Sequence, residues 1–133
     1  MSEIVNQFAK ELREAEETKL GIAPITSVRS DLTINDAYAI QLENIYRKLE
    51  QGHKVVGKKI GLTSLAMQNL LGVNEPDYGH LLDSMVIENG GAVPVDKVLQ
   101  PKVEGEIAFI LKKELRGPNV TTLDVLQATE YIV

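Results

Sequence analysis

The sequence predicts an α+β fold, with helices in residues 1–53 packed on a mixed β-sheet in residues 54–133. The first observation behind this is that apolar residues recur every three or four positions in the first part, as on one face of an amphipathic helix. The second is that short β-branched runs, bounded by glycine, asparagine and proline, follow. The third is the length of 133 residues, which suits one domain. We therefore expect a single domain over residues 1–133, with the functional site in its sheet part.

The first expected helix covers residues 2–20, and Gly21 is its expected stop. Residues 22–32 contain Pro24 and several serines and threonines, which favour a connecting loop. The apolar residues that define the helix face are Ile4, Val5, Phe8 and Leu12.

A second helix is expected after a capping box. Thr33 is followed three residues later by Asp36, the spacing at which the two side chains can bond each other's backbone N–H groups. Gly52 is the expected end of this helix. Its apolar residues at helical spacing are Tyr38, Leu42, Ile45 and Leu49.

Residues 55–63 are predicted to form a strand, because the run is short and β-branched at its start. Side chains alternate between the two faces of a strand, so Lys59 shares a face with Gly57 and Gly61. Such a face leaves room for a small ligand beside the lysine. Residues 64–71 are expected to form a short helix that ends at the following glycine.

Strands and turns are expected to alternate in the remainder of the chain. Thr121 and Asp124 predict a further capping box, which opens a helix through Thr129. The apolar end at residues 131–133 is unlike the polar sequence in which chains usually end, so we expect a truncated chain. The expected turns are 74–79, 89–91 and 116–119, and the expected strands are 80–88 and 103–111.

Composition excludes several classes of function. Lys and Arg number 14 against 19 Asp and Glu, a net charge of −5, and no basic run provides a nucleic-acid footprint. The absence of cysteine excludes disulfides, thiolate nucleophiles and cysteine-ligated zinc. The charged N-terminus and the lack of a long apolar stretch predict neither a signal peptide nor a membrane span. We therefore expect a cytoplasmic protein.

Glu104 and Glu106 are candidate metal ligands. They lie two residues apart in the predicted strand 103–111, so both carboxylates leave one face, with Cα atoms roughly 6.5–7 Å apart. Such hard oxygen ligands suit Mg²⁺ or Mn²⁺. The alternative is a solvated face, the common location of exposed carboxylates. Because the same face continues as Ala108 and Ile110, we expect the pair to point toward an apolar region, where two like charges need a cation between them.

Lys59 and Asp77 are candidates for acid–base chemistry. Lys59 and its neighbour Lys58 are suited to a solvated edge strand, but a lysine desolvated beside a metal can bind an anion or move a proton. Asp77 is equally the residue expected in a turn after proline. His53 and His80 are isolated and are assigned no role. Glycine-rich phosphate-binding patterns are missing, so a nucleotide enzyme is not expected.

Three motifs carry a resemblance to a known family. They are VVGKKIGLTS at 55–64, GVNEPDYG at 72–79 and LQPKVEGEIAF at 99–109. In this order they resemble the 2-oxopent-4-enoate hydratase and 2-oxo-3-hexenedioate (4-oxalocrotonate) decarboxylase family of the fumarylacetoacetate hydrolase-like superfamily. The resemblance is collinear over nearly the whole chain. It implies the N-terminal part of the fumarylacetoacetate hydrolase-like fold.

The resemblance also implies roles for four residues. Glu104 and Glu106 correspond to two of the family's three carboxylate ligands to Mg²⁺ or Mn²⁺. Lys59 and Asp77 correspond to its proton-handling and substrate-binding pair. The family's third metal-binding glutamate lies beyond the position where this sequence stops. The N-terminal half alone is therefore expected, with little or no activity by itself.

The implied activity is that of a lyase in aromatic hydrocarbon catabolism, which hydrates 2-hydroxypenta-2,4-dienoate (2-oxopent-4-enoate) to 4-hydroxy-2-oxopentanoate. In the family the metal acts as a Lewis acid on the substrate's carboxylate and C2 oxygen. Gly105 between the glutamates favours this hydratase over the 2-oxo-3-hexenedioate decarboxylase, which stays open. A non-catalytic oligomerising fragment or binding module also stays open. An apolar sheet edge near residues 103–111 predicts a homo-oligomer in either case.

Overall fold

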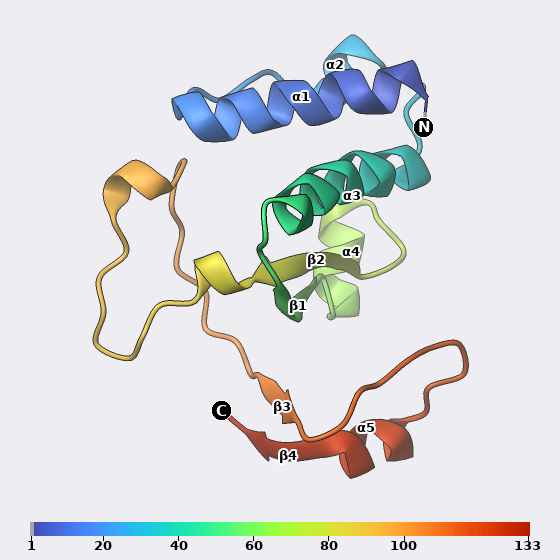
Figure 1. Ribbon diagram of the computed structural model, residues 1–133. Helices are drawn as coiled ribbons and strands as arrows, with labels where there is room; N and C mark the ends of the chain where they lie inside the picture. The colour runs from blue at the N-terminus through green and yellow to red at the C-terminus, as the bar shows by residue number, and fades with distance from the viewer. Residues whose placement is uncertain (1) are drawn as a thin grey trace. The chain divides into compact units, whose positions relative to one another are not determined.

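A computed structural model describes residues 2–133, and it confirms the α+β class. The chain forms two compact units, Met1–Leu99 and Gln100–Val133. The first contains the helices α1 to α4 and the strands β1 and β2, and the second contains β3, α5 and β4 (Figure 1). Instead of one mixed sheet, the described residues form two separate antiparallel strand pairs. The assignment of a single domain stays a prediction.

Helix α1 (Glu3–Thr18) begins where the side chain of Ser2 accepts a hydrogen bond from the backbone N–H of Val5. It ends earlier than predicted, because Lys19 adopts the left-handed conformation with φ of 58° and terminates the helix ahead of Gly21. A short helix, α2 (Ile25–Val28), occupies part of the expected loop. A single turn of this kind has too few residues to show a helical apolar pattern.

Helix α3 (Ile34–Glu50) confirms the second helix prediction. Thr33 and Asp36 form the predicted capping box in both directions. Gly52 follows the helix with φ of 97°, a conformation that glycine adopts without a steric penalty. The sequence signals at both ends of this helix were therefore sufficient to predict where it begins and ends.

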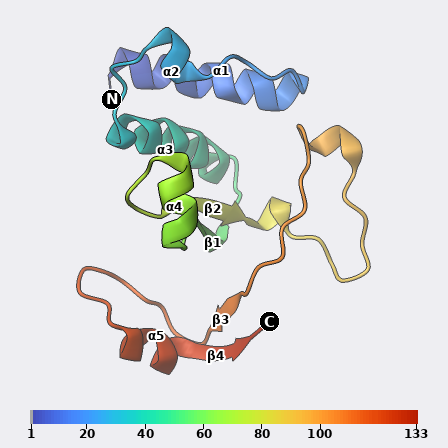
Figure 2. The ribbon, with the colours of Figure 1, turned by 180° about the vertical axis from the view of Figure 1, so that it is seen from behind.

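The core of the first unit lies between α1 and α3, which run side by side in both ribbon views (Figures 1 and 2). Asn44 on α3 donates to the backbone oxygen of Ala9 at 2.9 Å and accepts from the Arg13 guanidinium at 2.8 Å. These bonds fix the two helices against each other. The buried cluster comprises Val5, Phe8, Ala9 and Ile40.

A β-hairpin with an inserted helix follows α3. Strand β1 (Val55–Gly61) pairs antiparallel with β2 (Asp77–Leu82), and α4 (Leu65–Leu71) lies between them in sequence. Helix α4 has the predicted start and end, since Ser64 caps it and Gly72 takes a left-handed φ of 68°.

The limits of β2 correct two predictions. Residues 77–79 belong to the strand rather than to a turn, because they pair with the end of β1. The strand stops at Leu82 rather than at residue 88, and a 3-10 turn, Asp83–Met85, follows it. The Asp83 carboxylate accepts from the backbone N–H groups of Lys54 and Ser84, which turns the chain out of the sheet.

The second unit is a small antiparallel pair with one helix. Strand β3 (Phe109–Leu111) pairs with β4 (Thr129–Ile132), and α5 (Thr122–Ala128) begins with the predicted capping box of Thr121 and Asp124. The strand predicted at 103–111 is therefore wrong over most of its length. Backbone pairing begins at Ala108, which bonds Val133, and residues 103–107 have no strand opposite them in the described chain.

No helix formed by residues 2–133 combines the length and the apolar character that crossing a membrane requires.

Candidate active site

Lys59 and Asp77 lie on the same face of the β1–β2 pair. In the register, Lys59 is opposite Gly79 and Gly61 is opposite Asp77. Opposed residues of an antiparallel pair share a face, so these four residues lie together. Lys59 and Asp77 are diagonal neighbours, roughly 7–8 Å apart at the backbone and within reach of a long side chain. The prediction that Lys59 lies on a glycine-flanked face is therefore confirmed.

This face carries a pocket of about 270 Å³, lined by Lys59, Gly61, Asp77, Tyr78 and Gly79. The Asp77 carboxylate occupies the space that a Cβ atom would need at position 61, so a side chain there would push the carboxylate aside. At Gly79 a Cβ atom would meet nothing within 4 Å. The two glycines thus leave the lysine and the carboxylate accessible from one open hollow.

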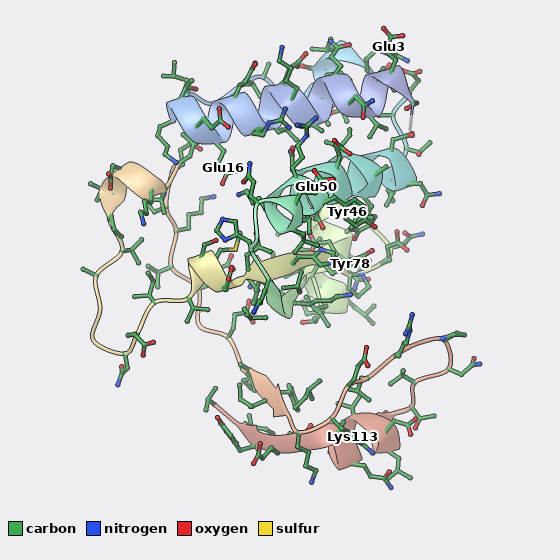
Figure 3. All side chains as sticks on the ribbon, viewed as in Figure 1. Glu3, Glu16, Tyr46, Glu50, Tyr78 and Lys113 are labelled. Carbon is green, nitrogen blue, oxygen red and sulfur yellow. The ribbon has the colours of Figure 1, made fainter. Side chains whose placement is uncertain are left out.

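The opposite face of β2 packs against α3. The rings of Tyr38 and Tyr78 stack with centroids 4.5 Å apart, and the Tyr78 N–H donates to the Tyr38 hydroxyl at 3.3 Å. Gln41 Nε2 donates to the Tyr78 carbonyl oxygen at 3.2 Å, and Gln41 Oε1 lies 3.2 Å from Nδ1 of His80. The Lys58 ammonium lies 5.7 Å from the Tyr78 ring centre. Tyr78, labelled in Figure 3, therefore lines the pocket and also contacts α3.

These α3 contacts were missed from the sequence. Tyr38 was taken only as an apolar member of the helix face, and Gln41 was given no role. The signal that could have found them is their spacing, since residues i and i+3 lie on one face of a helix. Burial, and secondarily the charge of Lys58, hold the pKa of His80 below its ordinary value.

His53 has a structural contact. Its Nδ1 atom lies 3.2 Å from the Asp83 carboxylate, next to the backbone bonds that end β2. Those backbone N–H donors, foremost that of Lys54, hold the pKa of Asp83 below its usual range. The pair joins the end of α3 to the end of β2.

Glu104 and Glu106 belong to the second unit, where they precede β3 and are exposed. The expectation that they share one strand face directed at an apolar region is wrong, because this segment is not a strand and Ala108 is exposed as well. Carboxylate oxygens are the donors that Mg²⁺ prefers. Residues 2–133, however, contain no group of three or more potential ligands. The two glutamates therefore have the donor chemistry that suits a divalent metal, and their role as ligands stays a prediction.

Comparison with known proteins places these observations in context. The chain is 49% identical over 131 residues to 2-hydroxypent-2,4-dienoate hydratase of Pseudomonas putida, covering 98% of this chain and 59% of the relative. It is 45% identical to 2-oxo-hept-4-ene-1,7-dioate hydratase of Escherichia coli and 40% identical to 4-oxalocrotonate decarboxylase of Pseudomonas sp. (strain CF600). Both matches cover 95% of this chain, and 47% and 48% of the respective relatives. No protein-family model matches.

Solved structures agree with the sequence matches. The chain superimposes on 4-oxalocrotonate decarboxylase from Pseudomonas putida G7, complexed with calcium and acetate, with a TM-score of 0.91 and 38% identity. The complex of that enzyme with magnesium and adipate gives a TM-score of 0.90. The chain spans about half the length of these proteins. In sequence it is similar to 2-hydroxydienoate hydratases and 4-oxalocrotonate decarboxylases, and in fold it matches the N-terminal part of the decarboxylase structure.

Proposed function

We propose that this chain contributes the proton-transfer groups of a metal-dependent lyase that hydrates 2-hydroxypenta-2,4-dienoate to 4-hydroxy-2-oxopentanoate. The observation that carries the proposal is the glycine-lined pocket shared by Lys59 and Asp77. The match to a hydratase at 49% identity supports the choice of substrate.

Lys59 and Asp77 have complementary roles in the proposed reaction. The Lys59 ammonium attracts the substrate carboxylate and supplies a proton, and the Asp77 carboxylate accepts a proton from water. Loss of the C2 hydroxyl proton and gain of a proton at C5 give 2-oxopent-3-enoate, whose C4 is electrophilic. The water oxygen then bonds to C4 and a proton reaches C3. General acid–base groups of this kind contribute about 10²–10⁴-fold to a rate.

Glu104 and Glu106 are the proposed ligands of a divalent metal, Mg²⁺ or Mn²⁺. When bound, such a metal supplies positive charge next to the carboxylate and C2 oxygen of the substrate. Support comes from the exposed oxygen donors and from the magnesium and calcium complexes of a relative. Because residues 2–133 hold no group of three potential ligands, we propose that another segment or another chain completes the site.

A second candidate is 2-oxo-3-hexenedioate decarboxylation. Its support is the structural match to a decarboxylase with a TM-score of 0.91. The same two side chains serve this reaction, in which the C–C bond to the departing CO₂ breaks, the 2-oxo group takes up the electron pair, and the resulting dienolate gains one proton. Gly105 favours the hydratase, as in the sequence resemblance.

Self-association in the cytoplasm is also proposed, with a small organic acid as a further partner. The support is apolar surface in the second unit, where Val103 is fully exposed and Ile107 is 72% exposed. Exposed apolar residues beside a short strand pair favour contact with a second copy.

The test of the proposed function uses a joined protein, in which this chain is followed by the remaining segment of the Pseudomonas putida hydratase that is 49% identical to it. Both 2-hydroxypenta-2,4-dienoate and 2-oxo-3-hexenedioate are assayed with Mg²⁺. We expect hydration of the first compound. Turnover of the dicarboxylate alone would establish the decarboxylase instead, and a folded joined protein inactive on both would contradict the proposal.

A further inference from the structure

The outer edge of β2 is covered by two side chains of α3 rather than by a third strand. Tyr78 is the residue at which this happens, since its N–H donates to the Tyr38 hydroxyl and its carbonyl accepts from Gln41 Nε2. In an antiparallel pair, every second residue directs both backbone groups away from its partner strand. Tyr38 and Gln41, three residues apart on one helix face, therefore satisfy both groups as a neighbouring strand does.

The bond to Tyr78 fixes the orientation of the Gln41 amide. A backbone carbonyl only accepts, so the NH₂ group of Gln41 must face it. Gln41 Oε1 then faces His80 Nδ1 at 3.2 Å, and because an amide oxygen only accepts, Nδ1 must carry the hydrogen. Burial and the nearby Lys58 lower the pKa of His80, which favours the neutral ring. The neutral ring then has its hydrogen on Nδ1.

These contacts bear directly on the pocket. Asp77 and Gly79 flank Tyr78 in β2, and both line the pocket. Rotation of the strand about Tyr78 would move the Asp77 carboxylate away from the space that Gly61 leaves for it. The Tyr38–Tyr78 stack and the two backbone bonds oppose that rotation.

We propose that Tyr38 and Gln41 are positioning residues that hold Asp77 in the pocket by fixing the backbone of Tyr78, and that Gln41 holds His80 as its Nδ1–H tautomer. The catalytic importance of this arrangement rests on the proposed function. The contacts themselves do not, so they are tested without any measurement of turnover.

The first test is the nitrogen spectrum of the His80 ring in the unmodified chain at a pH where the ring is neutral. We expect the ¹⁵N shifts and couplings of a protonated Nδ1 and an unprotonated Nε2. The opposite tautomer would overturn the assignment of the Gln41 amide. This measurement needs no variant, so it stands even where a substitution unfolds the chain.

The second test compares Tyr38→Phe and Gln41→Leu with Asn44→Leu as a matched control on the same helix. Asn44 bonds α1 and, among the residues that the structure describes, makes no hydrogen bond to β2. We expect Tyr38→Phe, which keeps the ring, to speed hydrogen exchange of the Tyr78 amide about tenfold, the equivalent of one hydrogen bond. We also expect both test variants to change the ¹³C chemical shift of the Asp77 carboxyl at neutral pH, whereas Asn44→Leu leaves that shift in place.

An unchanged Asp77 carboxyl chemical shift in folded Tyr38→Phe and Gln41→Leu would overturn the positioning role. Equal shifts in all three variants would also overturn it, because they would indicate general loosening of α3. Gln41→Glu separates the two contacts of Gln41, since a carboxylate accepts from His80 but cannot donate to the Tyr78 carbonyl. It should keep the His80 contact without restoring the chemical shift of the Asp77 carboxyl. Failure of these tests leaves the lyase assay unaffected, and an inactive joined protein leaves these tests unaffected.

Discussion

Gly61 lies directly opposite Asp77 in the β1–β2 pair, and the Asp77 carboxylate fills the space in which a side chain at position 61 would begin. The lack of a side chain at position 61 therefore allows the Asp77 carboxylate to take this position. The two residues belong to different sequence motifs, and the motifs alone do not indicate that the residues lie opposite each other.

Gly61→Ala should displace the Asp77 carboxylate. Because the clash is with the end of an exposed side chain that can rotate away, we expect the free energy of unfolding to fall by only about 0.5–1 kcal/mol. In the joined protein we expect turnover to fall about 10²-fold, the usual cost of misplacing a catalytic group by an ångström. Chemical denaturation and steady-state assays measure the two effects.

The matched control is Gly57→Ala on the same strand. A Cβ atom there would make an ordinary contact of 3.6 Å with the Leu81 side chain. We expect stability within about 0.5 kcal/mol of the unmodified chain and nearly unchanged turnover. Equal effects of the two substitutions on turnover would contradict the claim that a side chain at position 61 displaces the Asp77 carboxylate.

His80 should make stability depend on pH near neutrality. Burial and the charge of Lys58 lower its pKa in the folded chain, so the unfolded chain takes up the proton first as the pH falls. The contribution of His80 is fully present above about pH 6.5 and is lost as the pH falls through its lowered folded pKa. Lys58→Ala should raise the pKa of His80, as measured by an NMR titration. A fall or no change would contradict the assigned role of Lys58.

Local signals in the sequence were sufficient to predict much of the fold. The capping boxes at Thr33 and Thr121 and the glycine ends at Gly52 and Gly72 act through neighbouring backbone atoms, so their geometry follows from spacing. The face of Lys59 also followed, because strand alternation is local.

Other parts of the structure could not be predicted, because they depend on pairing between residues that are distant in the sequence. Residues 103–107 have strand-forming composition, but a strand needs a partner, and pairing with β4 begins only at Ala108. Conversely, residues 77–79 have turn composition but pair with β1. The contacts of Tyr38 and Gln41 were hidden for the same reason, since they bridge residues 37 to 40 positions apart.

The glutamate pair predicts that Mn²⁺ binds at Glu104 and Glu106 in preference to other exposed carboxylates. Paramagnetic broadening in the chain's amide spectrum should begin at residues next to Glu104 and Glu106, and Glu104→Gln together with Glu106→Gln should abolish it. Glu114→Gln, an exposed carboxylate in the same unit, is the control and should leave the broadening in place. Uniform broadening near all exposed carboxylates would contradict a specific site.

The most direct test of the central claim compares Lys59→Ala and Asp77→Asn with Lys58→Ala in the joined protein. Lys58 is adjacent in sequence but lies on the other face of β1, toward Tyr78 and His80. We expect kcat/KM for 2-hydroxypenta-2,4-dienoate to fall about 10²–10⁴-fold in the first two variants and to change little in the third. Retention of full turnover by Lys59→Ala or Asp77→Asn, or an equal loss in Lys58→Ala, would contradict the claim that these two side chains perform the proton transfers.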